Sequence, residues 1–223
     1  MELSSINPGT IILVVIALAL APFVAVMVTS FTKLVVVLSL LRNALGLQQT
    51  PPNVVINGLA IILSIYVMYP VLLLTYEQGM SQYQEFNLQD QDPTFDQLIE
   101  IIDSSKTPLR DFLVQHSSET ERAFFLKSIK RLMPAEKQES VSAQDFIVVI
   151  PAFTVSELTS AFQIGFLIFL PFLVIDLLVA NILLALGMMM LSPTMVSLPF
   201  KLLLFVFISG WTQLIHGLVQ SYI

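Results

Sequence analysis

Long apolar stretches on both sides of a charged middle segment constrain the fold of this chain more than any other feature. Residues 76–146 hold 13 of the 16 acidic residues and 7 of the 10 basic residues. A chain of 223 residues that is 56% hydrophobic carries more apolar surface than one soluble core can bury. We therefore expect the middle segment to face water and the flanks to face lipid or protein partners. The charged residues outside the middle segment are Glu2, Lys33, Arg42, Glu157, Asp176 and Lys201.

Four hydrophobic blocks make up the flanks, over residues 10–41, 54–75, 146–190 and 196–219. A transmembrane helix needs about 20 residues, so the first and third blocks exceed one straight span. The first block is either one span with an extension or two helices broken near Pro22 or near Thr29 and Ser30. Pro151 and Pro171 interrupt the third block. We expect an all-α membrane protein whose four hydrophobic helical blocks form broken helical hairpins.

A polar helical insert is predicted between the second and third blocks. Thr107 is a suitable N-cap, and Pro108 then occupies the first helical position, where proline is tolerated. Ser118 and Glu121 have the spacing of a capping box. Pro134 ends that helix. The predicted regions are an N-terminal hydrophobic hairpin region at 1–75, the insert at 76–146, and a C-terminal hydrophobic region with a methionine-rich loop at 147–223.

The positions of the basic residues predict the orientation in the membrane. If each block crosses once, the loops at 42–53 and 188–199 share one side, and Lys33, Arg42 and Lys201 flank them. The positive-inside rule places these loops in the cytoplasm and the insert outside, in the periplasm of a Gram-negative cell. The N-terminus lacks a basic region, and the first block is too long for a signal peptide, so we expect this segment to be retained.

Five charged residues lie within or beside the apolar blocks, and two interpretations of them remain open. A charge in hydrocarbon is costly, so each is expected to pair or to face water. They can form ion pairs between helices or subunits, which is the interpretation that we favour, or they can line an ion path. Lys201 and Arg42 can also reach a headgroup region. These residues are Lys33, Arg42, Glu157, Asp176 and Lys201.

Three consecutive methionines, Met188, Met189 and Met190, form the second candidate site. Methionine is unbranched and deformable. A ring of such side chains, with one set from each subunit, would seal a pore as a gasket and still yield to a passing chain. The alternative is ordinary apolar packing at the end of a helix.

The sequence contains none of the motifs that would indicate an enzyme. There is no cysteine, so thiolate metal sites and cysteine nucleophiles are excluded. No Walker loop, HExxH or Gly-x-Ser-x-Gly motif is present, and neither His116 nor His216 has a partner at metal-ligand spacing. We expect no catalytic residue, metal, cofactor or nucleic-acid partner. A secondary transporter or ion channel that acts alone stays open as an alternative function.

Several long, specific strings lie in the hydrophobic blocks. They are Leu41–Asn53, Pro151–Leu158, Ala161–Phe166, Leu170–Leu177, Leu184–Pro193, Leu198–Leu202 and Gly210–Trp211. These strings resemble the FliP/SctR/YscR family, and the clearest is the run from Leu184 to Pro193, which contains the three methionines. The resemblance covers nearly the whole chain outside the insert.

This resemblance implies a core subunit of the export gate in a bacterial type III secretion system. It implies about five copies with SctS-like and SctT-like subunits in the inner membrane, near a SctU-like switch protein and the inner rod or needle proteins. Unfolded substrates would pass transiently, and the methionine run would line a closure. It also implies that the assembled helices lie largely above the bilayer. Flagellar members commonly begin with a cleavable leader, so its predicted absence favours the virulence injectisome branch.

Overall fold

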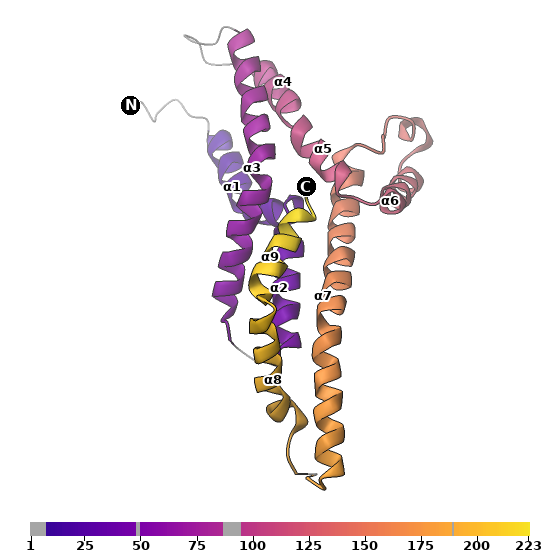
Figure 1. Cartoon of the computed structure of the whole chain (residues 1–223). Helices are drawn as coiled ribbons and strands as arrows, with labels where there is room; N and C mark the ends of the chain where they lie inside the picture. The colour runs from indigo at the N-terminus through magenta and orange to yellow at the C-terminus, as the bar shows by residue number, and fades with distance from the viewer. Residues whose placement is uncertain (1–7, 48–49, 87–94, 189) are drawn as a thin grey trace.

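The computed structural model consists of helices packed around one central helix. It describes residues 8–47, 50–86, 95–188 and 190–223, which form helices and turns with no strand among them. The predicted all-α class is therefore confirmed for the described residues. The elements are α1 (Pro8–Val28), α2 (Phe31–Ala44), α3 (Asn53–Glu85), α4 (Phe95–Ser105), α5 (Thr107–Gln115), α6 (Glu119–Leu132), the short 3-10 helix η2 (Ala135–Lys137), α7 (Phe146–Ala185), α8 (Pro193–Phe207) and α9 (Gly210–Gln220) (Figure 1).

Two helices in the described part of the chain are long and apolar enough to cross a membrane. They are α3, with 33 residues, and α7, with 40 residues. Helices α8 and α9 together would make a third span, but the chain bends by 60° between them. In Figure 1 the turns after α2 and after α7 lie toward the lower end, away from α4, α5 and α6. The side of the membrane on which each end lies stays a prediction.

The first and third hydrophobic blocks differ in whether they break. The first breaks at Thr29 and Ser30, while α1 continues through Pro22. The third does not break, because α7 continues through Pro151 and Pro171. The expectation of a broken hairpin there is wrong. Each proline removes one backbone hydrogen bond, but α7 lies along α2, and helices in proteins are stabilised mainly by packing of this kind.

Helix α2 lies at the centre of the apolar packing. Its side chains Leu34, Val37 and Leu38 are fully buried. They pack against α3, α7 and α9, through Ile56, Ala60, Ala161 and Leu218. One helical turn further on, Leu41 packs in a second cluster with Phe172 of α7 and Phe205 of α8. Because α2 touches each long helix, it positions the charged residues that these helices carry.

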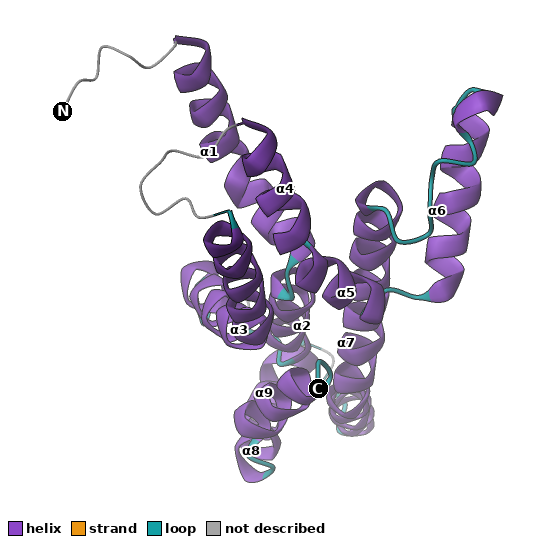
Figure 2. Ribbon diagram, turned by 90° about the horizontal axis from the view of Figure 1, so that it is seen from above, coloured by secondary structure: helices purple, strands orange, loops and turns teal. Residues whose placement is uncertain are grey.

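Helix α5 joins this bundle through a third apolar cluster. Phe112 and Leu113 pack against Val149 and Phe153 of α7 and against Met68 of α3. Helix α6 packs against α7 and lies on the side of α7 away from α3 (Figure 2). At its start, the backbone N–H of Ser118 donates to Ser156 Oγ of α7 over 2.9 Å.

The break between α8 and α9 redirects the C-terminal residues. Ser209 adopts a left-handed backbone conformation with φ of 51°. Gly210 follows and is buried beneath the Phe205 ring. After this bend of 60°, α9 lies along α2 and the C-terminus lies near α5 and α7 (Figure 1).

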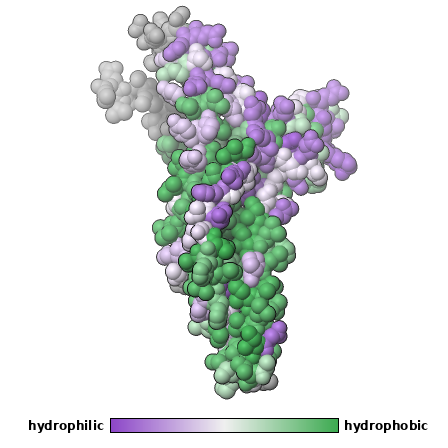
Figure 3. Space-filling view, viewed as in Figure 1, coloured by the Kyte–Doolittle hydropathy of each residue, from purple (hydrophilic) through white to green (hydrophobic). Residues whose placement is uncertain are grey.

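Apolar side chains cover much of the outer surface of the long helices. Figure 3 shows hydrophobic residues over the lower part of the molecule and hydrophilic residues gathered over α4 to α6. On α7 the side chains of Phe162, Phe166 and Leu167 are exposed by 60%, 64% and 65%. The monomer therefore leaves a large apolar surface without protein cover.

Candidate functional site

A buried ion pair joins α2 to α7. Lys33 Nζ lies 3.1 Å from Glu157 Oε1, and the two residues are 4% and 2% exposed. Helix α2 presents Lys33 on the same face as its buried leucines, and α7 presents Glu157 between Phe153 and Ala161. A pair with so little access to water is expected to be strongly coupled, because removal of either partner leaves an unpaired charge in the interior.

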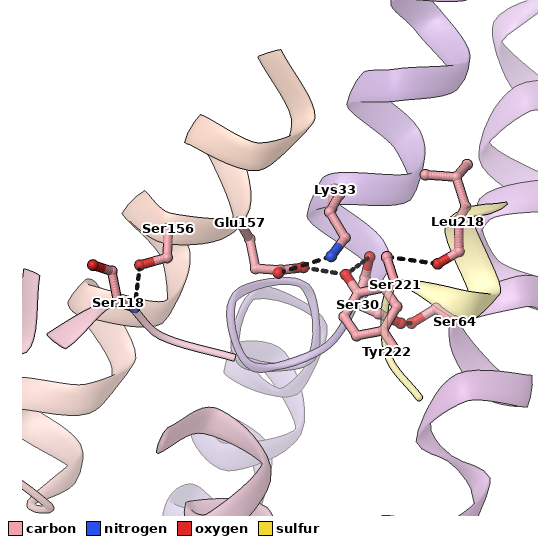
Figure 4. A network of polar contacts seen from close by, with 9 residues as sticks. All are labelled: Ser30, Lys33, Ser64, Ser118, Ser156, Glu157, Leu218, Ser221 and Tyr222. Atoms are coloured by element: carbon pink, nitrogen blue, oxygen red, sulfur yellow. Dashed lines mark hydrogen bonds and ion pairs between the residues drawn. The ribbon is translucent and has the colours of Figure 1, made fainter. Parts of the chain in front are cut away.

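Tyr222 completes this site from the other end of the chain. Its hydroxyl donates a hydrogen bond to Glu157 Oε2, and its ring lies 3.7 Å from Lys33 Nζ (Figure 4). Beside it, Ser30 Oγ donates to Ser64 Oγ of α3 over 3.2 Å. The sequence did not identify Tyr222 as a site residue, because no spacing rule relates residue 222 to residues 33 and 157. The one signal in the sequence is that this tyrosine closely follows the amphipathic stretch Gly210–Gln220.

A second ion pair joins α7 to α8. Lys201 Nζ lies 2.6 Å from Asp176 Oδ2 and also donates to the carbonyl oxygen of Ala44 over 3.3 Å. Ser197 Oγ donates to Asp176 Oδ1 over 2.5 Å. Lys201 is only 4% exposed, so it does not extend to a headgroup region. This site is less enclosed than the first, because the Asp176 side chain is 29% exposed.

Arg42 has no acidic partner within the described part of the chain. Its guanidinium donates to Asn53 Oδ1 over 2.5 Å and to the carbonyl oxygen of Pro51 over 3.3 Å. Arg42 therefore connects the end of α2 to the start of α3. The structure brings together Lys33 with Glu157 and Asp176 with Lys201, and it leaves Arg42 outside both pairs.

The methionine run lies in the turn between α7 and α8. Gly187 ends α7 with a positive φ of 70°, and the N–H of Met188 donates to the Leu183 carbonyl, a pairing typical of a glycine-terminated helix. Met188 is 49% exposed and Met190 fully exposed. Met189 lies outside the described residues. The described methionines of the run thus project from the turn and do not pack in the core.

Neither a metal centre nor a catalytic group emerges from the described residues. No three His, Asp or Glu side chains among them are grouped to hold a metal ion. His116 packs against aromatic rings, with its centroid 4.6 Å from that of Phe112 and 5.1 Å from that of Tyr222. The charged residues described above serve to join helices.

Comparison with known proteins gives consistent matches over the whole chain. The sequence profile of the FliP family matches residues 14–218. The chain is 52% identical to Yop proteins translocation protein R of Yersinia pestis over 212 residues, 95% of each chain. It is 47% identical to hypersensitivity response secretion protein HrcR of Ralstonia nicotianae over 223 residues, 99% of this chain and all of the relative. It is 45% identical to virulence protein YscR of Salmonella typhimurium over 216 residues, 97% of each chain.

These matches confirm the resemblance found in the sequence, including its injectisome branch. The relatives are named for secretion, translocation and virulence. Proteins of this kind are structural components of a secretion apparatus in a membrane, and they are not enzymes. On the match of its residues 14–218 and on these relatives, the chain belongs to the FliP family.

Proposed function

We propose that this protein is a core subunit of the export gate of a type III secretion system. In this function it forms, with partner subunits, a gated conduit through which unfolded substrates leave the cell. The observation that carries the proposal is the exposed apolar surface of α3 and α7, which a solitary chain leaves uncovered. Large exposed apolar patches on a protein mark surfaces that contact lipid or other subunits.

A groove between α7 and α8 supports subunit contact in particular. The groove has a volume of about 490 Å³, and only apolar atoms are exposed in it. Leu178, Ile182 and Phe200 are among the residues that line it. About five copies, with SctS-like and SctT-like subunits, would cover these surfaces. A SctU-like switch protein and the inner rod or needle proteins would be neighbours in the apparatus. The assembly would lie at the bacterial inner membrane with α4 to α6 on the periplasmic side.

The assembled state is the first test of this proposal. We expect the protein, coexpressed with its SctS-like and SctT-like subunits and extracted in mild detergent, to form one complex with about five copies of this chain. Native mass spectrometry counts the copies directly. A stable monomer that transports ions in liposomes without partners would instead favour a transporter that acts alone.

Loss of the methionine side chains is expected to make the closed assembly leak. In the proposed gate, Met188, Met189 and Met190 of each subunit form a gasket around one axis, and alanine leaves that gasket open. The triple replacement by alanine should therefore raise ion conductance across a planar bilayer containing the closed complex.

The control for this experiment replaces exposed methionines elsewhere, Met27 and Met80, with alanine. That variant should conduct no more than the unmodified complex. Equal conductance of the triple variant and the control would contradict the gasket, while an intact complex would leave the assembly proposal standing.

A further inference from the structure

Tyr222 contacts three separate parts of the fold at once. Besides Lys33 of α2 and Glu157 of α7, its ring stacks on Phe112 of α5 with centroids 6.1 Å apart and meets the His116 ring edge-on. We name the group formed by Lys33, Phe112, His116, Glu157 and Tyr222 the Tyr222 junction. It is the place where α5, which leads into α6, meets the charged interior of the hydrophobic helices.

His116 is the member of the junction whose side chain, when free, has a pKa nearest neutral pH. It lies at the end of α5, half-buried against Phe112 and Tyr222. The other charged and titratable members of the junction are Lys33 of α2, Glu157 of α7 and Tyr222, which follows α9. Nearby in the chain, Arg122 of α6 binds the carbonyl oxygens of Val114 and Ser117. The Glu157 carboxylate already accepts hydrogen bonds from both Lys33 and Tyr222.

We propose that the Tyr222 junction is a pH-sensitive latch that holds α5 on α2 and α7 while His116 is neutral and weakens when His116 is protonated. Tyr222 is the positioning residue of this latch, since it joins the rings of α5 to the Lys33–Glu157 pair. A proton on His116 adds a second cation near Lys33 at a place partly closed to water. The proposal concerns contacts within one chain and does not depend on the export-gate function.

The sign of the pH effect follows from the surroundings of His116. Burial, and then the nearby Lys33 charge, lower the pKa of His116 below its ordinary value. A histidine released from the junction regains a pKa of about 6.5 and takes up a proton below that pH. The docked state is therefore fully stable above about pH 6.5, and its docking equilibrium weakens by up to about tenfold for each pH unit below it.

Distance measurements between spin labels on α5 and α7 test the latch directly. The chain has no cysteine, so labels on Asp111→Cys and Thr159→Cys, both exposed positions, report on these two helices alone. Double electron–electron resonance on the full-length protein in detergent should give one narrow distance population at about pH 7.5 and a second, longer one at about pH 5. A single population unchanged between the two pH values would overturn the proposal.

Variants of the two histidines assign the response. We expect His116→Gln to keep the narrow population at both pH values, because glutamine does not titrate. The matched control, His216→Gln, changes an exposed histidine on α9 and should respond to pH as the unmodified protein does. A pH response that survives in His116→Gln would place the sensor elsewhere, for example at Glu157, and would overturn the latch.

Variants of Tyr222 test its positioning role. Tyr222→Phe keeps the ring contacts but removes the hydrogen bond to Glu157, so the longer population should appear at a higher pH than in the unmodified protein. Tyr222→Ala removes both contacts and should show the longer population even at about pH 7.5. If Tyr222→Ala fails to fold, the pH at which the longer population appears in Tyr222→Phe still tests the positioning role of Tyr222. If Tyr222→Phe and the unmodified protein change between the two distance populations at the same pH, the positioning role of Tyr222 is contradicted.

Discussion

Replacement of Glu157 with alanine is expected to lower the free energy of unfolding by about 3–5 kcal/mol. The change leaves the Lys33 ammonium group buried at 4% exposure without its carboxylate partner, and it removes the acceptor of the Tyr222 hydroxyl. Thermal unfolding in detergent, followed by the helical circular dichroism signal, measures the loss. We expect it to be the largest effect of any single charge removal in the chain.

The exposed pair between Asp103 and Lys106 supplies the control. Both residues lie at the surface, where water screens their interaction, so Asp103→Ala should change the unfolding temperature little. A further variant, Lys33→Met with Glu157→Leu, removes both buried charges and should recover much of the lost stability. Equal unfolding temperatures for Glu157→Ala and Asp103→Ala would show that the buried pair does not stabilise the fold.

The second large effect is expected from Gly210→Ala, at the start of α9. A Cβ at this position would lie 2.2 to 2.7 Å from three atoms of the Phe205 ring. That ring is 6% exposed and packs against Phe172 and Trp211, so it has little room to move. Overpacking of this kind typically costs about 1–3 kcal/mol. It should also shift α9. Thermal unfolding measures the loss of stability, and spin labels on α9 detect the shift.

Gly217 in the same helix provides a matched control, because nothing lies within 4 Å of the Cβ that alanine would add there. Gly217→Ala should stabilise the helix by about 0.5–1 kcal/mol, since alanine is the better helix former. Combining Gly210→Ala with Phe205→Leu should restore part of the loss. If Gly210→Ala proves as stable as Gly217→Ala, the α8–α9 break does not depend on the close approach of the ring.

Local signals in the sequence predicted a good part of the fold. The length and hydropathy of the blocks predicted the all-α class, and Ser118 and Pro134 predicted the ends of α6 within a few residues. The break of the first block fell at Thr29 and Ser30, one of the two places considered. The prolines of α7 wrongly predicted a break, because the sequence does not reveal that α2 packs along the helix that contains them.

The candidate site was harder to predict, because its contacts join residues far apart in the chain. The cost of a charge in an apolar segment singled out Lys33, Glu157, Asp176 and Lys201 without indicating which acid meets which base. Tyr222 could not be predicted either, because it is far in sequence from both charges and because a tyrosine near an apolar helix is common. Its role follows from the bend at Ser209, where the Ser209–Gly210 pair indicates a turn but not the direction that the chain takes after it.

The contact between Tyr222 and the Lys33–Glu157 pair has a consequence for biosynthesis. Residue 222 is synthesised after both α2 and α7, so the charges of these helices at first lack an aromatic cover. The nascent chain must then keep Lys33 and Glu157 hydrated or loosely paired until residue 222 has been made. The buried pair is therefore completed only after α2, α7 and α9 have all been synthesised.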